Sequence, residues 1–402
     1  MRPNLAVCPI CQVEYPLDYL EIHASSCGES LEETPPIVED VCKSPKGGIR
    51  NLNDVIQAIA DGVSTDGKTF DITVSRQNLF ERGLVQWQRQ KKTSPTNPLK
   101  GIFLGEAGID TGALRKEFLT TMVAGIERRF FVKGSSGCTP IIPCLTWIKT
   151  ISNQVKRTAG EIMATSLAQG GPAPNFMMPW CYKFLCTGSL DFETLDEDDV
   201  EDDQYTDLLS KVKSATETTI LDLTEEILNC GHTGSVCLEK KEEIIRSVVL
   251  HANLRLIPIL QQIRDGMGLY SLCHIMAKYP DICRPLFVPG IEMKADADFI
   301  ISVCQAEFSE RGSNKQLVEV TLMNHLQDFL QELEQDETES GKEKAASLSP
   351  PGFLQWVTGQ GHIPILQEDK KSFRVNVKFS HHCQSQFVVF RIMLLAVTYW
   401  RI

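Results

Sequence analysis

Residues 102–118 read IFLGEAGIDTGALRKEF and combine a strand, a loop and a helix in one short stretch. With Gly101 before them, the first three residues predict a short apolar strand at 101–104, which the loop GEAGIDTG follows. After the loop, apolar residues recur at helical spacing and predict a helix with Asp110 or Thr111 as its N-cap. These apolar residues are Leu114, Phe118, Met122, Val123 and Ile126. The order of elements indicates the start of a large mixed α+β domain.

The glycines of this loop allow a second interpretation, a phosphate-binding loop. Such a loop ends in Gly-Lys-Ser or Gly-Lys-Thr, which is absent, and its anion would meet Glu106 and Asp110. We therefore interpret the loop as a turn that positions the following helix. The motif GGPAP at 170–174 is likewise interpreted as a rigid turn.

Further periodic patterns divide the rest of the chain. Ile72 and Val74 alternate like a strand, and residues 373–379 alternate strictly between apolar and polar positions. Helical patterns occur at 219–228, 242–256 and 317–330, and Pro258 is expected to kink or end the second of them. Two polar stretches are expected to be a solvated loop and a mobile loop, 196–203 and 331–349.

The composition favours a protein partner over nucleic acid or membrane. The chain has 402 residues, enough for two or three domains, and a formal net charge of -12 that opposes binding to phosphate groups or anionic lipid. Residues 387–402 are apolar but include Arg391 and are shorter than the roughly 20 residues that span a bilayer. No secretory signal is evident, so we expect a cytoplasmic or nuclear protein whose 14 cysteines stay reduced.

Four residues near the N-terminus have the spacing of a zinc site. Cys8, Cys11, His23 and Cys27 form the pattern C-x2-C-x11-H-x3-C, in which four ligands can converge on Zn²⁺. The alternative is a set of unconnected reduced thiols. Residues 8–27 contain no Lys or Arg, so the phosphate contacts of a DNA-reading finger are missing and a protein partner is favoured.

The ligand pattern is similar to that of the ubiquitin-binding UBZ finger. The similarity implies a small zinc finger at 1–28 that contacts ubiquitin, with a Pro-rich and Gly-rich linker at 29–70. The UBZ family usually has an Asp two residues after the ligand His, where this chain has Ser25. A finger that docks a different protein is the alternative.

Five segments resemble, in order, the HECT family of ubiquitin ligases, and in particular the vertebrate subgroup in which zinc-binding modules precede a divergent ligase domain. The segments are VSRQNLFERGLVQW (74–87), IFLGEAGIDTGALRKEF (102–118), AGEIMATSLAQGGPAPNF (159–176), FSERGSNKQLVEVTLMNHLQDFL (308–330) and FLQWVTGQGHIPI (353–365). The resemblance implies a bilobal, mainly helical domain with short sheets.

The same resemblance implies the roles of the lobes. The N-terminal lobe would cover 71–294 and dock a ubiquitin-conjugating enzyme at about 185–265. The C-terminal lobe would cover 295–402 and would move about a hinge near 302–312, for which Gly312 is the candidate. Ubiquitin would pass from the conjugating enzyme to a cysteine of the C-terminal lobe and then to a lysine of a protein substrate.

The acceptor cysteine of the family follows the strand matched by 373–379. In this chain Cys383, within SHHCQ, is the sole cysteine after that strand, and it lies too close to the strand, so it is a weak candidate and no catalytic residue is assigned. Cys181, Cys186 and Cys273 lie in apolar stretches and are expected in the core.

Residues 386–402 resemble nothing in the family. The resemblance therefore implies an incomplete C-terminal lobe with a divergent tail, and a transferase that is inactive as written. The alternative is a non-catalytic adaptor or decoy of the ubiquitin pathway.

Overall fold

The computed structural model describes residues 5–7, 14–16, 48–105, 112–141, 153–290, 295–340, 349–384 and 387–397. Its description of side chains leaves out residues 5–6, 14–16, 336–340 and 380–397. Within these ranges the chain is mainly helical with short sheets, and its buried apolar residues form two separate clusters. The first cluster contains residues from Val55 to Val288, together with Ile365, and its residues up to Val288 define what we call the body with its arm. The second, from Ala295 to Val375, defines the C-terminal unit.

The body begins with two parallel strands joined by a helix. Strands β3 (Phe70–Val74) and β4 (Leu99–Phe103) pair in parallel, and α3 (Leu79–Arg89) connects them. Alternate residues of both strands are buried, as the apolar alternation predicts. Both predicted strands are thus confirmed, with β4 beginning two residues earlier than the apolar run at 101–104.

The helix after the glycine loop is α4 (Ala113–Phe130), and its predicted face is buried. Its N-cap is Gly112, at φ 113°, and no side chain caps it, so the prediction of Asp110 or Thr111 as N-cap was wrong. Residues 106–111 lie outside the described ranges. A positive φ at Gly112 turns the chain sharply into the helix, which only glycine does without strain.

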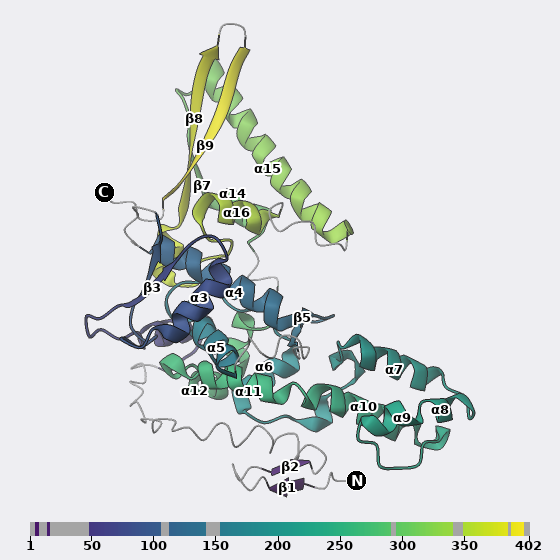
Figure 1. Cartoon of the computed structure of the whole chain (residues 1–402). Helices are drawn as coiled ribbons and strands as arrows, with labels where there is room; N and C mark the ends of the chain where they lie inside the picture. Colours follow the sequence, from purple (N-terminus) through teal and green to yellow (C-terminus); the bar gives the residue numbers. More distant parts are fainter. Residues whose placement is uncertain are drawn as a thin grey trace.

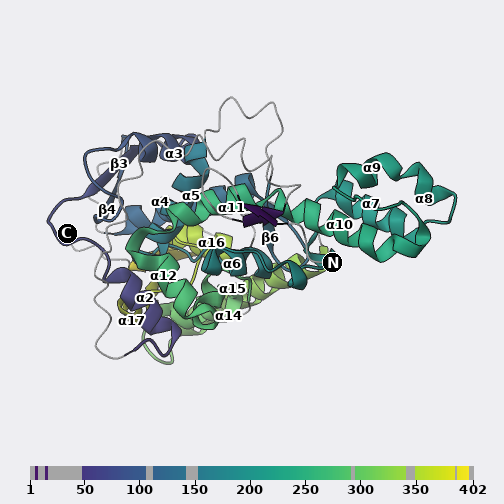
Figure 2. The same ribbon diagram turned by 90° about the horizontal axis from the view of Figure 1, so that it is seen from below.

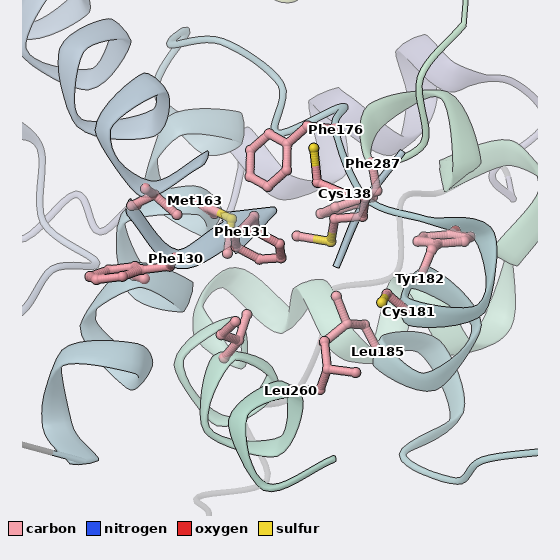
Figure 3. Packing of buried hydrophobic residues seen from close by; sticks show 14 of the residues in the cluster. Phe130, Phe131, Cys138, Met163, Phe176, Cys181, Tyr182, Leu185, Leu260 and Phe287 are labelled. Atoms are coloured by element: carbon pink, nitrogen blue, oxygen red, sulfur yellow. The ribbon is translucent and has the colours of Figure 1, made fainter. Parts of the chain in front are cut away.

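Helices surround α5 (Asn153–Ala168) to complete the body. They are α6 (Pro179–Thr187), α11 (Ile257–Gly266), α12 (Leu272–Lys278) and α13 (Pro280–Cys283), with the short 3-10 turns η5 (Leu269–Ser271) and η6 (Arg284–Leu286). A small antiparallel pair, β5 (Phe131–Lys133) and β6 (Cys138–Pro140), follows α4. Figure 3 shows Phe131, Phe176, Tyr182 and Phe287 packed with Cys138 and Cys181 in this core.

The folded body begins earlier than the sequence suggests. Helix α2 (Leu52–Ala60), capped by Asn51, buries Val55, Ile56 and Ile59 in the first cluster. The prediction of a linker over 29–70 is therefore wrong for this part of the range. The helix was missed because its nine residues give only a brief apolar period.

Helices of the segment between α6 and α11 form what we call the arm, residues 192–254. They are η2 (Phe192–Thr194), η3 (Glu197–Asp199), α7 (Asp203–Ser214), α8 (Thr219–Asp222), α9 (Thr224–Asn229), η4 (Leu238–Lys240) and α10 (Lys241–Leu254). Pro258 was predicted to kink or end the helix at 242–256. Instead α10 ends at Leu254, and Pro258 lies in the first turn of α11, where a missing N–H leaves no hydrogen bond unmade. The pattern at 219–228 is two short helices rather than one.

The C-terminal unit is built on a three-stranded sheet of order β7-β8-β9. Strand β7 (Cys304–Glu307) pairs in parallel with β8 (Arg374–Gln384), and β9 (Phe387–Val397) pairs antiparallel with β8. Helices α14 (Ala297–Val303), α15 (Asn314–Ser340) and α16 (Pro350–Thr358) pack beside the sheet, and α17 (Gln367–Ser372) precedes β8 (Figure 1). The strand predicted at 373–379 is confirmed, with Phe373, Val375 and Val377 buried.

Two sequence expectations for this unit change. The predicted mobile loop at 331–349 begins as helix, because α15 continues to Ser340. The tail at 386–402, which resembles nothing in the HECT family, supplies β9, whose backbone pairs along the whole of β8. Within the parts of the chain that the structure describes, no helix combines the length and apolar character needed to cross a bilayer.

Candidate functional site

The arm is the part of the molecule that stands away from the body. Figures 1 and 2 show α7, α8, α9 and the N-terminal half of α10 projecting to one side, with the rest of the chain on the other. Its own small core contains Leu208 and Val212 of α7, Ile220 of α8, Ile227 of α9 and Val248 of α10, all buried. It therefore presents a large surface that the body does not cover.

Arginine side chains fix the arm internally and at its base. The Arg246 guanidinium donates to the carbonyl oxygens of Leu195, at 2.6 Å, and of Phe192. Arg255, just after α10, donates to the Tyr205 hydroxyl and lies over that ring, 5.0 Å from its centre. Because guanidinium groups donate in fixed planar directions, these contacts hold η2 and α7 at defined positions against α10.

The outer surface of the arm carries exposed apolar and acidic residues together. Leu221 on α8 is 58% exposed and Leu228 on α9 is 49% exposed. Single exposed leucines are common on surfaces, so exposure alone would indicate nothing. Here they accompany exposed carboxylates on the same two helices and before them, namely Glu217, Asp222, Glu225 and Glu226. This surface suits a protein partner with an apolar contact region bordered by basic side chains.

The acidic run at 196–203 was predicted to be a solvated loop. Its carboxylates are exposed or half-buried, as predicted, but part of the run is the 3-10 turn η3 and not an irregular loop. Asp196 and Asp199 form a reciprocal capping box around η3, and Asp202 accepts a hydrogen bond from the backbone N–H of Gln204 at the start of α7. Partial burial raises the pKa of Asp199. A groove of about 360 Å³ lies beside this run, lined by Glu242 and Arg246 among others. The carboxylates thus order the base of the arm.

The predicted zinc ligands Cys8, Cys11, His23 and Cys27 lie outside the described residues. The two strands on either side of the first ligand pair are described, β1 (Leu5–Val7) and β2 (Glu14–Pro16), and they pair antiparallel. In the sequence, the first ligand pair lies between these two paired strands. Among the described residues, no group of three or more His, Cys, Asp or Glu side chains is placed to hold a metal ion.

Cys383 lies on β8, where its backbone is paired with Val388 of β9. It is thus part of a strand and not of a loop beyond one. Its side chain, and those of His381 and His382, are outside the described ones. The weak candidacy of Cys383 stays a prediction.

Gly312 does not lie between the two clusters. It is exposed, at φ 85°, between β7 and α15, both of which belong to the C-terminal unit, and its N–H donates to Oε1 of Gln316 at 2.6 Å. Apart from Ile365, the first cluster ends at Val288, and the second begins at Ala295. The chain therefore passes between them at 289–294, of which 291–294 are outside the described ranges. A hinge at Gly312 would move α15 against its own sheet.

The cysteines expected in the core are there. Cys181 and Cys186 are buried and Cys273 is half-buried. Burial raises the pKa of Cys181 and of Cys186, and it raises the pKa of Cys273 to about 11. Because a thiolate is the reactive form, these thiols are poor nucleophiles at neutral pH, as predicted for core residues.

Comparison with known proteins finds a distant similarity to a ubiquitin ligase. No family model matches the sequence. The chain is 22% identical over 295 residues to the G2/M phase-specific E3 ubiquitin-protein ligase of Gallus gallus, a similarity that covers 69% of this chain. The chain spans only 38% of the length of that relative. Over the matched region, the chain is a distant relative of a ubiquitin ligase.

Proposed function

We propose that the chain is a HECT-type ubiquitin-transferase domain whose arm docks a ubiquitin-conjugating enzyme. The observation that carries the proposal is the projecting arm with exposed Leu221 and Leu228 among carboxylates, on a chain distantly related to a ubiquitin ligase. The arm falls within the range 185–265 that the HECT resemblance assigns to docking. A cytoplasmic or nuclear location is part of the proposal, because thiol transfer requires reduced cysteines.

The chemistry of the arm supports a fast and specific encounter. Complementary charge steers partners together and raises the association rate, whereas buried apolar anchors lower the dissociation rate. We expect the conjugating enzymes that bind to present apolar residues bordered by Lys or Arg. Raising the salt concentration should slow association, because it screens the carboxylates of the arm.

Binding of the full chain to a panel of conjugating enzymes tests the docking. Replacing Leu221→Asp and Leu228→Asp should weaken the affinity at least tenfold, since an added charge would be desolvated at the contact. The matched control is Leu317→Asp, because Leu317 is 69% exposed but lies on α15 in the C-terminal unit. Equal affinity of the arm variants and the parent chain would refute docking through this surface.

The proposal has an enzymatic form and an adaptor form. In the enzymatic form the chain accepts ubiquitin from the docked enzyme as a thioester, with Cys383 as the candidate acceptor. In the adaptor form it binds the conjugating enzyme and a protein partner without accepting ubiquitin. Incubation with activating enzyme, conjugating enzyme, ATP and ubiquitin separates the two. A thiol-sensitive adduct that Cys383→Ser removes supports the enzymatic form, and retained docking without an adduct supports the adaptor form.

A zinc finger formed by Cys8, Cys11, His23 and Cys27 is a separate part of the proposal. The spacing of the four residues supports it, and the antiparallel pairing of β1 with β2 brings the strands on either side of the first ligand pair together. Elemental analysis of the purified chain should find one equivalent of zinc that the double variant Cys8→Ser, Cys11→Ser lacks. Ubiquitin is the candidate ligand of the finger. Titration of ubiquitin into the zinc-loaded chain tests this, and the arm variants should leave that binding unchanged.

A further inference from the structure

Residues 361–369 follow α16 and connect the two cores. Ile363 packs against the second buried cluster, whereas Ile365 and Leu366 lie on the side of the body. Ile365 is 1% exposed and belongs to the first buried cluster, and Leu366 packs against the same cluster. Residues on both sides of this segment, such as Leu354 and Phe373, belong to the second cluster. Between Leu354 and Phe373, the chain therefore contributes Ile365 to the core of the body and then rejoins the core of the C-terminal unit. We call this segment the latch.

The body holds the latch in a seat formed by the GGPAP turn and the start of α4. A Cβ atom at Gly170, whose φ is 78°, would lie 2.9 Å from Oδ2 of Asp369 and 3.1 Å from Cδ1 of Leu366. Lys116 of α4 pairs with Asp369, Nζ to Oδ2 2.7 Å, and their side chains are only 12% and 21% exposed. The GGPAP turn at 170–174, which was interpreted from the sequence only as a rigid turn, is thus part of the surface on which the latch lies.

A pocket of about 270 Å³, partly open to solvent, lies beside the latch. Ala173 after α5, Pro289 at the end of the body and His362 of the latch are among the residues that line it. Residues of the body and of the C-terminal unit therefore line one pocket at the latch.

The latch contains three titratable side chains, His362, Glu368 and Asp369, and His362 is the one that lies beside the pocket. Both of its ring nitrogens are shut off from solvent, and neither has a hydrogen-bond partner of normal geometry. Burial lowers the pKa of His362 to about 3, the charge of Lys116 lowers it further, and the nearby Gly170 carbonyl opposes both weakly. The charged groups around the ring are Lys116 from α4 and its partner Asp369 from α17. The seated ring is therefore neutral.

We infer that residues 361–369 are a releasable latch that holds the C-terminal unit on the body, and that release takes up a proton at His362. When the latch leaves its seat, the imidazole regains water and separates from Lys116. The proton enters from solvent, binds a ring nitrogen and leaves on reseating. The latch does not depend on the proposed ubiquitin chemistry.

The expected size of the effect follows from linkage. His362 binds its proton with an ordinary pKa of about 6.5 when released and about 3 when seated. A pKa lowered in the seated state means that seating is favoured above pH 6.5 and weakened as the pH falls below it. Between pH 7.5 and pH 5.5 the equilibrium constant for release should rise about tenfold, since the released state alone gains the proton.

Hydrogen–deuterium exchange of the full chain at these two pH values tests the inference. After correction for intrinsic exchange, peptides covering 361–373 and the seat at 166–176 should exchange about tenfold faster at pH 5.5, and they should do so together. Fraying of α17 alone would affect 361–373 without the seat. That outcome, or exchange that does not change with pH in either peptide, overturns the inference.

Variants assign the effect to its groups. His362→Gln should abolish the pH dependence in both peptides, whereas His274→Gln, at an exposed position on α12, should keep it. Asp369→Asn should raise exchange at both pH values while leaving the ratio between them unchanged. Its matched control is Glu307→Gln, which breaks the exposed ion pair with Lys378 inside the C-terminal unit. A pH dependence that survives in His362→Gln overturns the role of the histidine.

Discussion

Glu161 brings a carboxyl group into the body on α5, where Trp87 donates its indole N–H to Oε2 at 3.0 Å. Burial raises the pKa of Glu161, although the Trp87 hydrogen bond and the charge of Arg157 oppose the rise. A carboxylate there loses hydration that one hydrogen bond does not replace. The hydrogen bond needs only an acceptor oxygen, which an amide also supplies.

We therefore expect Glu161→Gln to stabilise the protein at neutral pH. A raised pKa in the folded state means that ionisation at Glu161 destabilises the fold increasingly as the pH rises above about 4, the ordinary value for glutamate. The free energy of unfolding of the variant should exceed that of the parent chain at pH 7 and equal it below pH 4. Urea denaturation at both pH values measures this. A variant less stable at pH 7 would show that the ionised form is favoured.

Thiol reactivity is the second prediction at the level of single residues. Burial raises the pKa of Cys283 to about 12 and of Cys138 to about 11. At pH 7.4 iodoacetamide should leave both unmodified in the folded chain, and Cys237, which is half-buried, should react before either of them. Mass spectrometry after a timed pulse reads the order, and unfolding in urea should make all three react. Early alkylation of Cys283 would contradict the burial.

At the scale of elements, the crossing of α5 and α11 organises the body. A Cβ atom at Gly160 would collide with the carbonyl oxygen of Ile263, and one at Gly266 would collide with the carbonyl oxygen of Arg157. The two backbones therefore touch at a pair of glycines, one from each helix. Because backbone atoms of packed helices cannot turn aside as side chains can, this crossing has no room for a methyl group.

Gly160→Ala should consequently reduce the free energy of unfolding by roughly 1–3 kcal/mol, even though alanine is the better helix former. Gly268→Ala is the matched control, because the nearest atom to its added Cβ would be 3.4 Å away. Chemical denaturation of both variants gives the comparison. Stabilisation by Gly160→Ala would mean that α5 and α11 can move apart to admit a methyl group without a loss of packing energy.

Local sequence patterns predicted the individual helices and strands better than the contacts between them. The alternation at Phe373, Val375 and Val377 predicted β8, and helical spacing predicted α4 and α10, because these signals arise from burying one face of a single element. The seat at Gly170 and the pairing of β9 could not be foretold, since they depend on residues far apart in the sequence. For the candidate site, the family resemblance predicted the docking range that contains the arm. The exposure of Leu221 and Leu228 could not be predicted, because it depends on how the helices of the arm pack.

At the scale of the whole molecule, the sheet of the C-terminal unit depends on its last strand. In the order β7-β8-β9, strand β8 is central, and β9 covers one of its edges. An uncovered edge presents unpaired N–H and C=O groups to other chains. The sequence of β9, FVVFRIMLLAV, is also strongly apolar.

Deleting residues 386–402 should thus make β8 an edge strand and cause self-association. Sedimentation velocity of the shortened and parent chains at equal concentration measures this. The shortened chain should form larger species as concentration rises, and Lys or Glu substitutions on β8 should reduce them. A shortened chain that remains monomeric would show that β9 is dispensable for the sheet.

The parallel pairing of β7 with β8 also sets an order of events during synthesis. Cys304 of β7 pairs with Val375 of β8, and the core of the body includes Ile365, so both need residues that are synthesised late. Neither cluster is therefore complete when residue 290 leaves the ribosome. Before residues 365–378 are synthesised, the site of Ile365 in the core of the body is unfilled and β7 has no strand to pair with. Non-local contacts of this kind slow folding and leave apolar surface open to chaperones. The core of the body and the pairing of β7 with β8 are therefore completed in the same late interval, as residues 365–378 emerge, and β9 completes the sheet afterwards.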